Sequence, residues 1–434
     1  MNRRQLARLI CVVVVGACAR TPRSGSITPP TPRDRFHLAA TLAAAGRCDT
    51  AVVVATAAQA LAPGDVRGPL VLGGCQEQAG RFDDAIATYN AFAAAHPGAR
   101  GVAALRAKAQ LALRNAAEQT ARQALAREAE LAQQPPQAAT VAVLPLVIAG
   151  DSSVQPLSRG LADLITTDLA HIRTLRLVER LQIGMLLDEL KAGQSERTDP
   201  ATAARVGRLL QAERMVQGTA TIPPIPPNGA ATIQLSATVV TTVGVVRPVG
   251  QVTGLFRQLL ALEKQVVFDL AGQLGIALTE AERQQILRQG PKSLAAFLAY
   301  SRALDDLDRG DYDGAARNFG AATRADPSFQ AARQGQETAA ATPAVQQSGA
   351  GGIVTLVEVV EQVTPPSAGP AAAAGGLLTT TTLDVVPATG DVIAQAGGPP
   401  SGTPTIDRHL TPEALGLPSI VSVTSGIVII FRRP

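Results

Sequence analysis

The sequence predicts an α+β multi-domain protein in which helical repeats flank a central α/β domain. Three observations lead to this prediction: a recurring helical pattern near the N-terminus, an alternation of apolar strands with amphipathic helices in the middle, and a Gly- and Pro-rich C-terminal stretch. The 434 residues leave room for two or three domains of about 100–200 residues each. Only 3% of the residues are aromatic and none is Trp, so the cores must consist mainly of Ala, Val and Leu. We expect six segments, bounded as 1–17, 18–33, 34–134, 139–278, 279–336 and 337–434.

The first segment has the features of an export signal. Arg3, Arg4 and Arg8 form a positive start, and the apolar run 9–15 is too short to cross a bilayer as a helix. Subtracting these three charges from the formal net charge of +4 leaves +1 for the rest of the chain. Because no run of basic residues is longer than two, we expect no nucleic-acid partner.

The signal ends in Val15-Gly16-Ala17-Cys18, which resembles the lipobox of bacterial lipoproteins. The resemblance implies cleavage before Cys18 and stable anchoring through acyl chains such as palmitate. Ala19, in place of an Asp, implies sorting to the outer membrane on its periplasmic side. An ordinary secretory signal or an uncleaved anchor is the alternative. Residues 18–33 are rich in Pro, Ser and Thr, and we expect them to form a flexible tether.

Two related helical patterns follow in residues 34–134, the second 34 residues after the first. Small residues let two antiparallel helices approach, and large residues fill the space between them. The pattern resembles the tetratricopeptide repeat, and we expect its signature residues to be structural. They are Gly46, Ala51 and Pro63 in the first repeat and Gly80, Phe82, Ala85, Tyr89 and Pro97 in the second. Residues 99–133 are expected to form a long helix or a degenerate third pair.

Cys48 and Cys75 are the candidate disulfide pair. They remain after Cys11 leaves with the signal and Cys18 carries the lipid, and the periplasm is oxidising. Cys48 begins the second helix of the first repeat. Cys75 lies about a turn from the end of the antiparallel helix expected beside it. Two buried free thiols that pack as small apolar side chains are the alternative.

The central segment, 139–278, alternates strands and helices. A continuous apolar run indicates a buried strand, and strict alternation indicates a strand with one wet face. Asp199-Pro200 is a favourable helix start, with an N-cap followed by Pro at the first helical position. The strands are expected over 140–148, 175–178, 214–222, 233–239 and 245–253.

This order of elements resembles the domain shared by the curli secretion lipoprotein CsgG, the flagellar lipoprotein FlgO and the N-terminal domain of TolB-like proteins. The resemblance is carried by residues 141–146, 160–172, 175–190 and 199–221. The curli channel builds its barrel from long hairpin insertions, whereas the connection 222–231 (IPPIPPNGAA) is short and Pro-rich here. We therefore do not expect pore formation.

A further tetratricopeptide-like pattern lies in the helical segment 279–336. Its signature residues are Gly310, Tyr312, Ala315, Phe319 and Pro327. One repeat cannot bury its own apolar face, so this one must pack on the central domain or on a partner. The resemblance implies binding of protein segments; a scaffold without a ligand of its own is the alternative.

The last segment, 337–434, is low in complexity and sparse in charge. Residues 353–363, 376–386 and 418–431 have the Val, Ile and Thr content of strands, separated by Pro/Gly/Ala stretches. We expect either a small β-element or a disordered tail that becomes ordered on a partner.

The sequence contains no recognisable catalytic motif and no metal-ligand spacing. His37, His96, His171 and His409 are isolated, and we expect His171 to place a cation at a helix C-terminus. The acidic cluster from Asp305 to Asp313 lacks the ligand order of a calcium loop. The pairs Glu179–Arg180 and Asp188–Glu189 are expected to be solvated. We predict no enzyme activity, no metal and no cofactor.

The combined features predict a non-enzymatic lipoprotein, anchored to the outer membrane and facing the periplasm. Its expected role is a protein-interaction scaffold in envelope assembly or secretion, with other envelope proteins or further copies of the chain as partners. A regulator of a peptidoglycan-synthesising enzyme is the alternative, because the synthase activator LpoB is a lipoprotein of similar fold.

Overall fold

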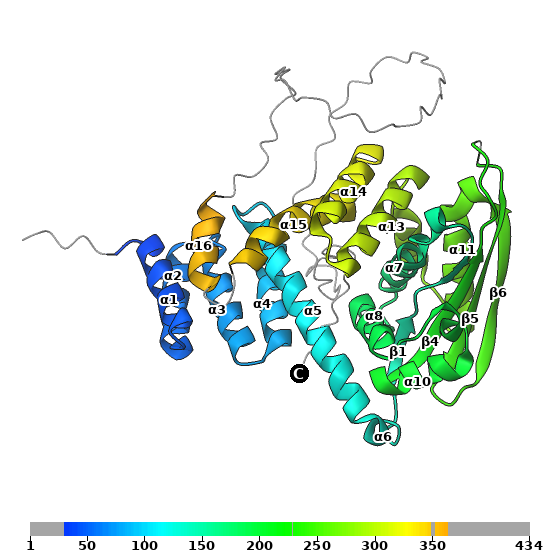
Figure 1. Cartoon of the computed structure of the whole chain (residues 1–434), viewed down its shortest axis with the longest axis horizontal. Coiled ribbons are helices and arrows are strands. Elements are labelled where there is room, and N and C mark those ends of the chain that lie inside the picture. Colours follow the sequence, from blue (N-terminus) through cyan, green and yellow to red (C-terminus); the bar gives the residue numbers. More distant parts are fainter. Residues whose placement is uncertain (1–29, 228, 349–351, 363–434) are drawn as a thin grey trace, which may run out of the picture.

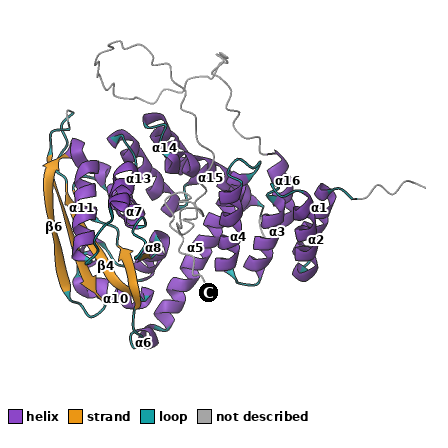
Figure 2. Ribbon diagram, turned by 180° about the vertical axis from the view of Figure 1, so that it is seen from behind, coloured by secondary structure: helices purple, strands orange, loops and turns teal. Residues whose placement is uncertain are grey.

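The computed structural model describes residues 30–227, 229–348 and 352–362. A row of helices begins at α1 and runs toward an α/β domain, whose sheet lies at the opposite end of the molecule (Figure 1). Figure 2 shows from behind that the strands form one sheet and that the rest of the described chain is mostly helical. The N-terminal repeats and the sheet are therefore held apart by helices.

The N-terminal part of the row consists of antiparallel helix pairs. Their bounds are α1 Pro32–Ala44, α2 Cys48–Leu61, α3 Arg67–Gln78, α4 Phe82–Ala95, α5 Val102–Ala126 and α6 Glu128–Leu131. Helix α1 starts with a capping box between Thr31 and Asp34. The helix therefore takes in the last two residues of the expected tether, 18–33. Residues 99–133 form one long helix, α5, and the short α6.

A mixed sheet forms the centre of the α/β domain. Its strands are β1 Gln137–Val143, β2 Val147–Ala149, β3 Arg176–Leu177, β4 Ala212–Thr221, β5 Thr232–Thr241 and β6 Val246–Leu255. The order is β3-β1-β4-β5-β6, with β2 also paired to β4. Strands β3, β1, β2 and β4 run parallel, whereas β4, β5 and β6 are antiparallel.

The prediction of a single strand over 140–148 is wrong. The chain leaves the sheet between β1 and β2, at residues 144–146, and both strands pair with the long β4. Pro145 lies in this break. Proline has no N–H to donate to a neighbouring strand. An interruption of the strand at this position therefore leaves no backbone donor of Pro145 unpaired.

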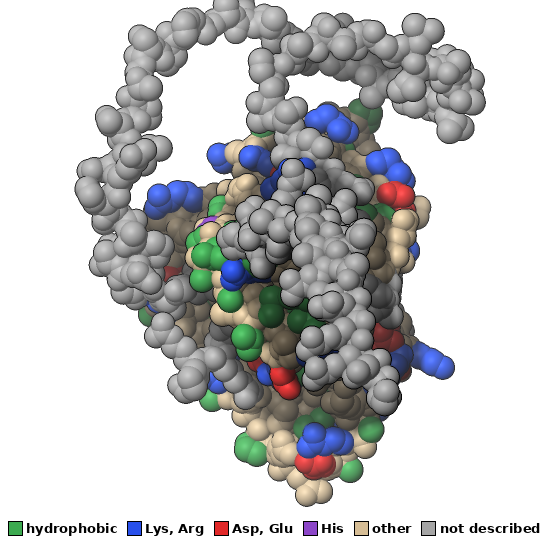
Figure 3. All heavy atoms as spheres, turned by 90° about the vertical axis from the view of Figure 1, so that its left-hand side faces the viewer, with side chains coloured by type: hydrophobic (Ala, Val, Ile, Leu, Met, Phe, Trp, Pro, Cys, Tyr) green, Lys and Arg blue, Asp and Glu red, His purple; other side chains and the backbone are tan. Residues whose placement is uncertain are grey.

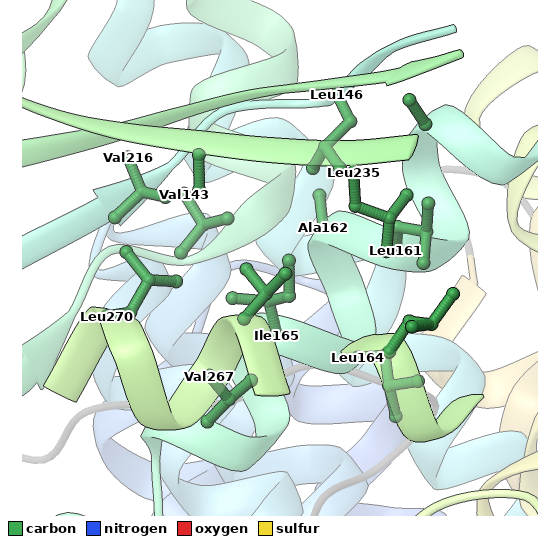
Figure 4. Close-up of a cluster of buried hydrophobic side chains, with 14 of the residues drawn as sticks. Val143, Leu146, Leu161, Ala162, Leu164, Ile165, Val216, Leu235, Val267 and Leu270 are labelled. Carbon is green, nitrogen blue, oxygen red and sulfur yellow. The ribbon is translucent and has the colours of Figure 1, made fainter. Parts of the chain in front are cut away.

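Helices cover both faces of the sheet. Helices α7 (Leu157–Leu169) and α11 (Leu259–Gln273) bury one face in the largest apolar cluster, part of which Figure 4 shows. Helices α8 (Arg180–Glu189) and α10 (Pro200–Leu210) cover the other face. The remaining short elements are η1 Ser152–Val154, α9 Gln194–Arg197, η2 Phe256–Gln258 and α12 Glu280–Arg288.

The C-terminal repeat contacts both the N-terminal repeats and the α/β domain. Helices α13 (Leu294–Arg309), α14 (Tyr312–Ala325) and α15 (Gln330–Gln347) follow one another. Helix α13 packs on α7 of the α/β domain and α15 packs on α5. We expected this repeat to pack on the central domain or on a partner; it packs on the central domain and also on the N-terminal repeats.

Helices continue into the region that was expected to be a tail from 337 onward. Helix α15 extends to Gln347, and α16 (Gly352–Gln362) covers the segment 353–363, whose composition is strand-like. For these residues the expectation of a small β-element or a disordered tail is wrong, because β-branched residues favour strands only weakly and packing decides. Here the apolar side chains meet other helices at helical spacing. The strands predicted over 376–386 and 418–431 lie outside the described residues.

A buried carboxyl pair lies between α7 and α11. Glu263 and Asp168 are both fully buried, and Lys264 Nζ forms an ion pair with Asp168 and lies 3.4 Å from Glu263 Oε2. Burial, followed by the charge of Asp168, raises the pKa of Glu263 well above its ordinary value. Burial also raises the pKa of Asp168 to about 6, against the opposing charge of Lys264. The folded chain therefore holds protons here that the unfolded chain releases.

We expect the free energy of unfolding to fall as the pH rises from about 4 to 8, because a carboxyl whose pKa is raised in the fold stabilises it fully below the unfolded pKa and loses this contribution as the pH rises through the folded pKa. Glu263→Gln should remove part of this loss and stabilise the protein at pH 8 by about 1–2 kcal/mol. Urea unfolding at the two pH values measures the effect. Asp269→Asn, on the exposed side of the same helix, is the control. A variant that loses stability at pH 8 would contradict this account.

Candidate functional site

The predicted signature residues of the repeats lie in turns and in helix contacts. Gly46, Gly80 and Gly310 have φ values of 74°, 71° and 78° in the turns between paired helices, a conformation that glycine adopts without steric cost. Ala51, Ala85, Tyr89, Ala315 and Phe319 are fully buried, and Tyr312 is nearly so. Phe82 is half-buried, while Pro63, Pro97 and Pro327 lie exposed after their helices. These residues shape the repeats and do not present a ligand site.

A disulfide joins Cys48 at the start of α2 to Cys75 in α3, with 5.5 Å between the Cα atoms. This distance is ordinary for a disulfide. The apolar contacts between α1 and α2 come largely from alanine, with Ala39, Ala43, Ala51 and Ala55 in one cluster. Alanine buries little apolar area, so the packing of these helices contributes little stability, and the disulfide adds to it.

The repeats and the α/β domain meet at a buried charge network, which we call the junction. Its centre is Arg180 at the start of α8, which is 8% exposed. Its Nη1 and Nη2 lie 2.7 and 3.1 Å from the two carboxylate oxygens of Asp308 on α13. Its Nε lies 3.6 Å from Asp163 on α7. A bidentate arginine–carboxylate pair fixes orientation as well as distance.

Further contacts extend the junction to four helices. Arg159 of α7 also forms an ion pair with Asp308, and its Nη1 lies 2.8 Å from Asp305 Oδ1. The Tyr300 hydroxyl donates to Asp163 at 3.0 Å. Arg114 of α5 donates from Nη1 and Nη2 to the carbonyls of Leu307 and Asp308, at 3.2 Å each. The last turn of α13 is therefore held from α5, α7 and α8 together.

Burial controls the protonation of the junction. It raises the pKa of Asp163 to about 7, against the charge of Arg180. It also raises the pKa of Glu179 to about 7, although Glu179 caps α8 by accepting from the N–H of Leu181 at 2.6 Å. Burial acts on Asp308 in the same direction, but the charges and hydrogen bonds of Arg180 and Arg159 outweigh it and lower its pKa.

The expectation that Glu179 and Arg180 are solvated is wrong, because both are 8% exposed. Asp188 and Glu189 are exposed, as expected. Sequence reasoning missed the junction because nothing in a linear pattern tells a buried charge from a surface one. The available signal was the spacing of Asp305 and Asp308, which places both on one face of a helix.

Among the described residues, no group of three or more His, Cys, Asp or Glu could hold a metal ion. A cavity of about 20 Å³ beside the junction is lined by Gln110, Arg114 and Asp308 among others, and has room for about one water molecule. His171 follows α7, where burial and Lys264 lower its pKa. The lowered pKa disfavours the cation that we expected at this helix end. His409 lies outside the described residues.

Comparison with protein families matches two parts of the chain. Residues 42–111 match the model of the tetratricopeptide repeat, and residues 122–222 match the model described as curli production assembly/transport component CsgG. The chain carries tetratricopeptide repeats and a CsgG-like domain. Neither curated proteins nor solved structures give a match to it.

The CsgG-like match covers only part of the α/β domain. It begins within α5, at residue 122, and ends directly after β4. Strands β5 and β6 and helix α11 therefore lie beyond it, although they complete the sheet and its core. Within residues 30–227, 229–348 and 352–362, no helix is both long and apolar enough to cross a membrane. On the face shown in Figure 3, lysine and arginine side chains outside the grey atoms are scattered.

We expect reduction of the Cys48–Cys75 disulfide to destabilise the N-terminal repeats. A cross-link that closes a loop of 27 residues restricts the unfolded chain and stabilises the fold by about 3–4 kcal/mol. Thermal unfolding with and without dithiothreitol measures the loss, and a Cys48→Ser/Cys75→Ser chain should match the reduced wild type. If reduction leaves the melting temperature unchanged, the link does not support the repeats.

Asp308→Asn should destabilise the chain by about 3–5 kcal/mol, because it leaves the buried Arg180 and the half-buried Arg159 without their shared carboxylate. Chemical unfolding gives the magnitude. Asp188→Asn, on the exposed end of α8, is the matched control and should change stability by less than about 0.5 kcal/mol. Equal losses for the two variants would contradict the role given to the junction.

Proposed function

We propose that this chain is a non-enzymatic lipoprotein, anchored to the outer membrane through Cys18 and facing the periplasm. In this proposal it acts as a protein-interaction scaffold in envelope assembly or secretion. Tetratricopeptide repeats generally mediate protein–protein contacts, and the matched CsgG family relates to curli secretion. The scaffold role thus draws on the two matched segments, and the lipid anchor rests on the lipobox-like residues before Cys18, which lie outside the described residues.

The junction is the observation that carries the proposal. A buried bidentate pair, Arg180–Asp308, holds the repeats and the α/β domain in one arrangement. The second contact, α15 on α5, includes Arg106, which is 3% exposed and lies 3.4 Å from Glu337. A scaffold needs such fixed geometry, because two partners bound at opposite ends are then held at a constant distance.

Exposed apolar side chains on the repeats mark positions where a partner can be trapped. Leu38, Val53 and Leu61 are 53%, 68% and 58% exposed on α1 and α2. Each accepts a photo-crosslinking residue without disturbing a core. Leu287 on α12 of the α/β side is 49% exposed and serves as the matched control position.

Photo-crosslinking in intact envelopes should link the repeat positions to specific envelope proteins, or to a second copy of the chain, and the Leu287 position to different proteins. Cys18→Ser should release the chain from the outer-membrane fraction and reduce crosslinking at the repeats. Mass spectrometry identifies the products.

Two results would overturn the proposal. A Cys18→Ser chain that still fractionates with the outer membrane would remove the anchor. A penicillin-binding protein as the main crosslinked partner would replace the assembly role with regulation of cell-wall synthesis.

A further inference from the structure

Helix α16 lies against the N-terminal repeats, although it is far from them in sequence. It packs on α1, α3 and α15 (Figure 1). We call the surface that it covers on α1, α3 and the start of α5 the α16 seat. Ile353 and Val357 join the cluster of Ala39 and Val71, while Leu356 and Val360 join the cluster of Leu70. One short helix thus bridges two separate cores of the repeats.

The four anchors of α16 are the pattern of a helix bound in a groove. Ile353, Leu356, Val357 and Val360 stand at positions i, i+3, i+4 and i+7, and all are buried. Thr355 and Glu358 point to solvent. This spacing is how an amphipathic helix presents one apolar face to a receptor.

The seat has space set aside for these anchors. Gly74 lies inside α3, where glycine is a poor helix former. A Cβ at this position would come within 2.6 Å of Ile353 Cδ1, and its close neighbours are all atoms of Ile353. A side chain at position 74 would therefore clash only with a helix that occupies the seat.

The helix itself has little reason to form alone. It has 11 residues, and its sequence GIVTLVEVVEQ is dominated by β-branched side chains, which lose rotamer freedom in a helix. An isolated helix of this length is marginal in water even for favourable sequences. Its helical state therefore depends on the seat, whereas α1 starts with a capping box and α2 and α3 are joined by a disulfide.

We propose that the α16 seat is a helix-binding site that the chain fills with its own α16, and that a partner protein occupies it by displacing α16. The partner segment is an amphipathic helix with branched apolar residues at i, i+3, i+4 and i+7. This proposal rests on the proposed function as a scaffold and names the chemistry of its partner. While α16 occupies the seat, only the fraction of chains with an open seat can bind such a segment. The apparent affinity is the intrinsic affinity multiplied by that fraction.

The first test fills the seat in the full chain. Gly74→Leu should increase hydrogen exchange of residues 352–362 at least tenfold while the amides of α3 and α4 stay protected. Gly184→Leu is the matched control, because it also replaces a glycine inside a helix, with no heavy atom within 4 Å of its added Cβ. Unchanged protection of α16, or opening of α3 and α4 together with it, would overturn the proposal.

The second test measures binding to the purified full chain by fluorescence anisotropy, with a labelled peptide of residues 352–362 as the probe. The double variant Ile353→Asp/Val357→Asp, which releases the resident helix, should bind the peptide at least tenfold more tightly than wild type. Adding Gly74→Leu should abolish this gain, and Thr355→Asp on the exposed face should behave as wild type.

Equal peptide affinity for wild type and the double variant would overturn the proposal. Because both tests use the isolated chain, they succeed or fail separately from crosslinking in the envelope. Peptide exchange without any envelope partner would support a helix-binding seat and would refute both the scaffold role and the displacement of α16 by a partner.

Discussion

The arrangement of the whole molecule depends on the pairing of Arg180 with Asp308. Their charges come from segments 128 residues apart and meet with bidentate geometry, with side chains that are only 8% and 14% exposed. Each charge would be costly to bury alone. Asp163 and Arg159 complete their surroundings, so the charges are compensated inside the protein. An apolar contact could slide, whereas this pair permits only one orientation of α13 on the α/β domain.

This constraint explains how the helical repeats form one row in space although the α/β domain interrupts them in the sequence. The α/β domain is inserted between α5 and α13, yet α15 returns to pack on α5. The repeat that contains Tyr312 and Phe319 therefore lies next to the N-terminal repeats, although the α/β domain separates them in the sequence. The α/β domain that contains the CsgG-like part therefore lies at the end of the helical row, as Figure 1 shows.

The N-terminal repeats solve a different problem. Their helices meet through alanine, which permits close approach but buries little apolar area per residue. The disulfide between Cys48 and Cys75 and the covering helix α16 both compensate for this thin core. The core of the N-terminal repeats gains part of its apolar contacts from α16. A different helix with the same apolar pattern could make these contacts in its place.

The sequence by itself determined the elements whose signals are local: turn glycines such as Gly80, the capped start of α10 at Asp199, and the alternating strand β5. These follow from backbone sterics and from side chains a few residues apart. Only the tertiary structure decided that residues 352–362 are a helix and that Arg180 is buried. Both depend on partners more than a hundred residues away in the chain, so the free energy that settles them comes from contacts that no local pattern contains.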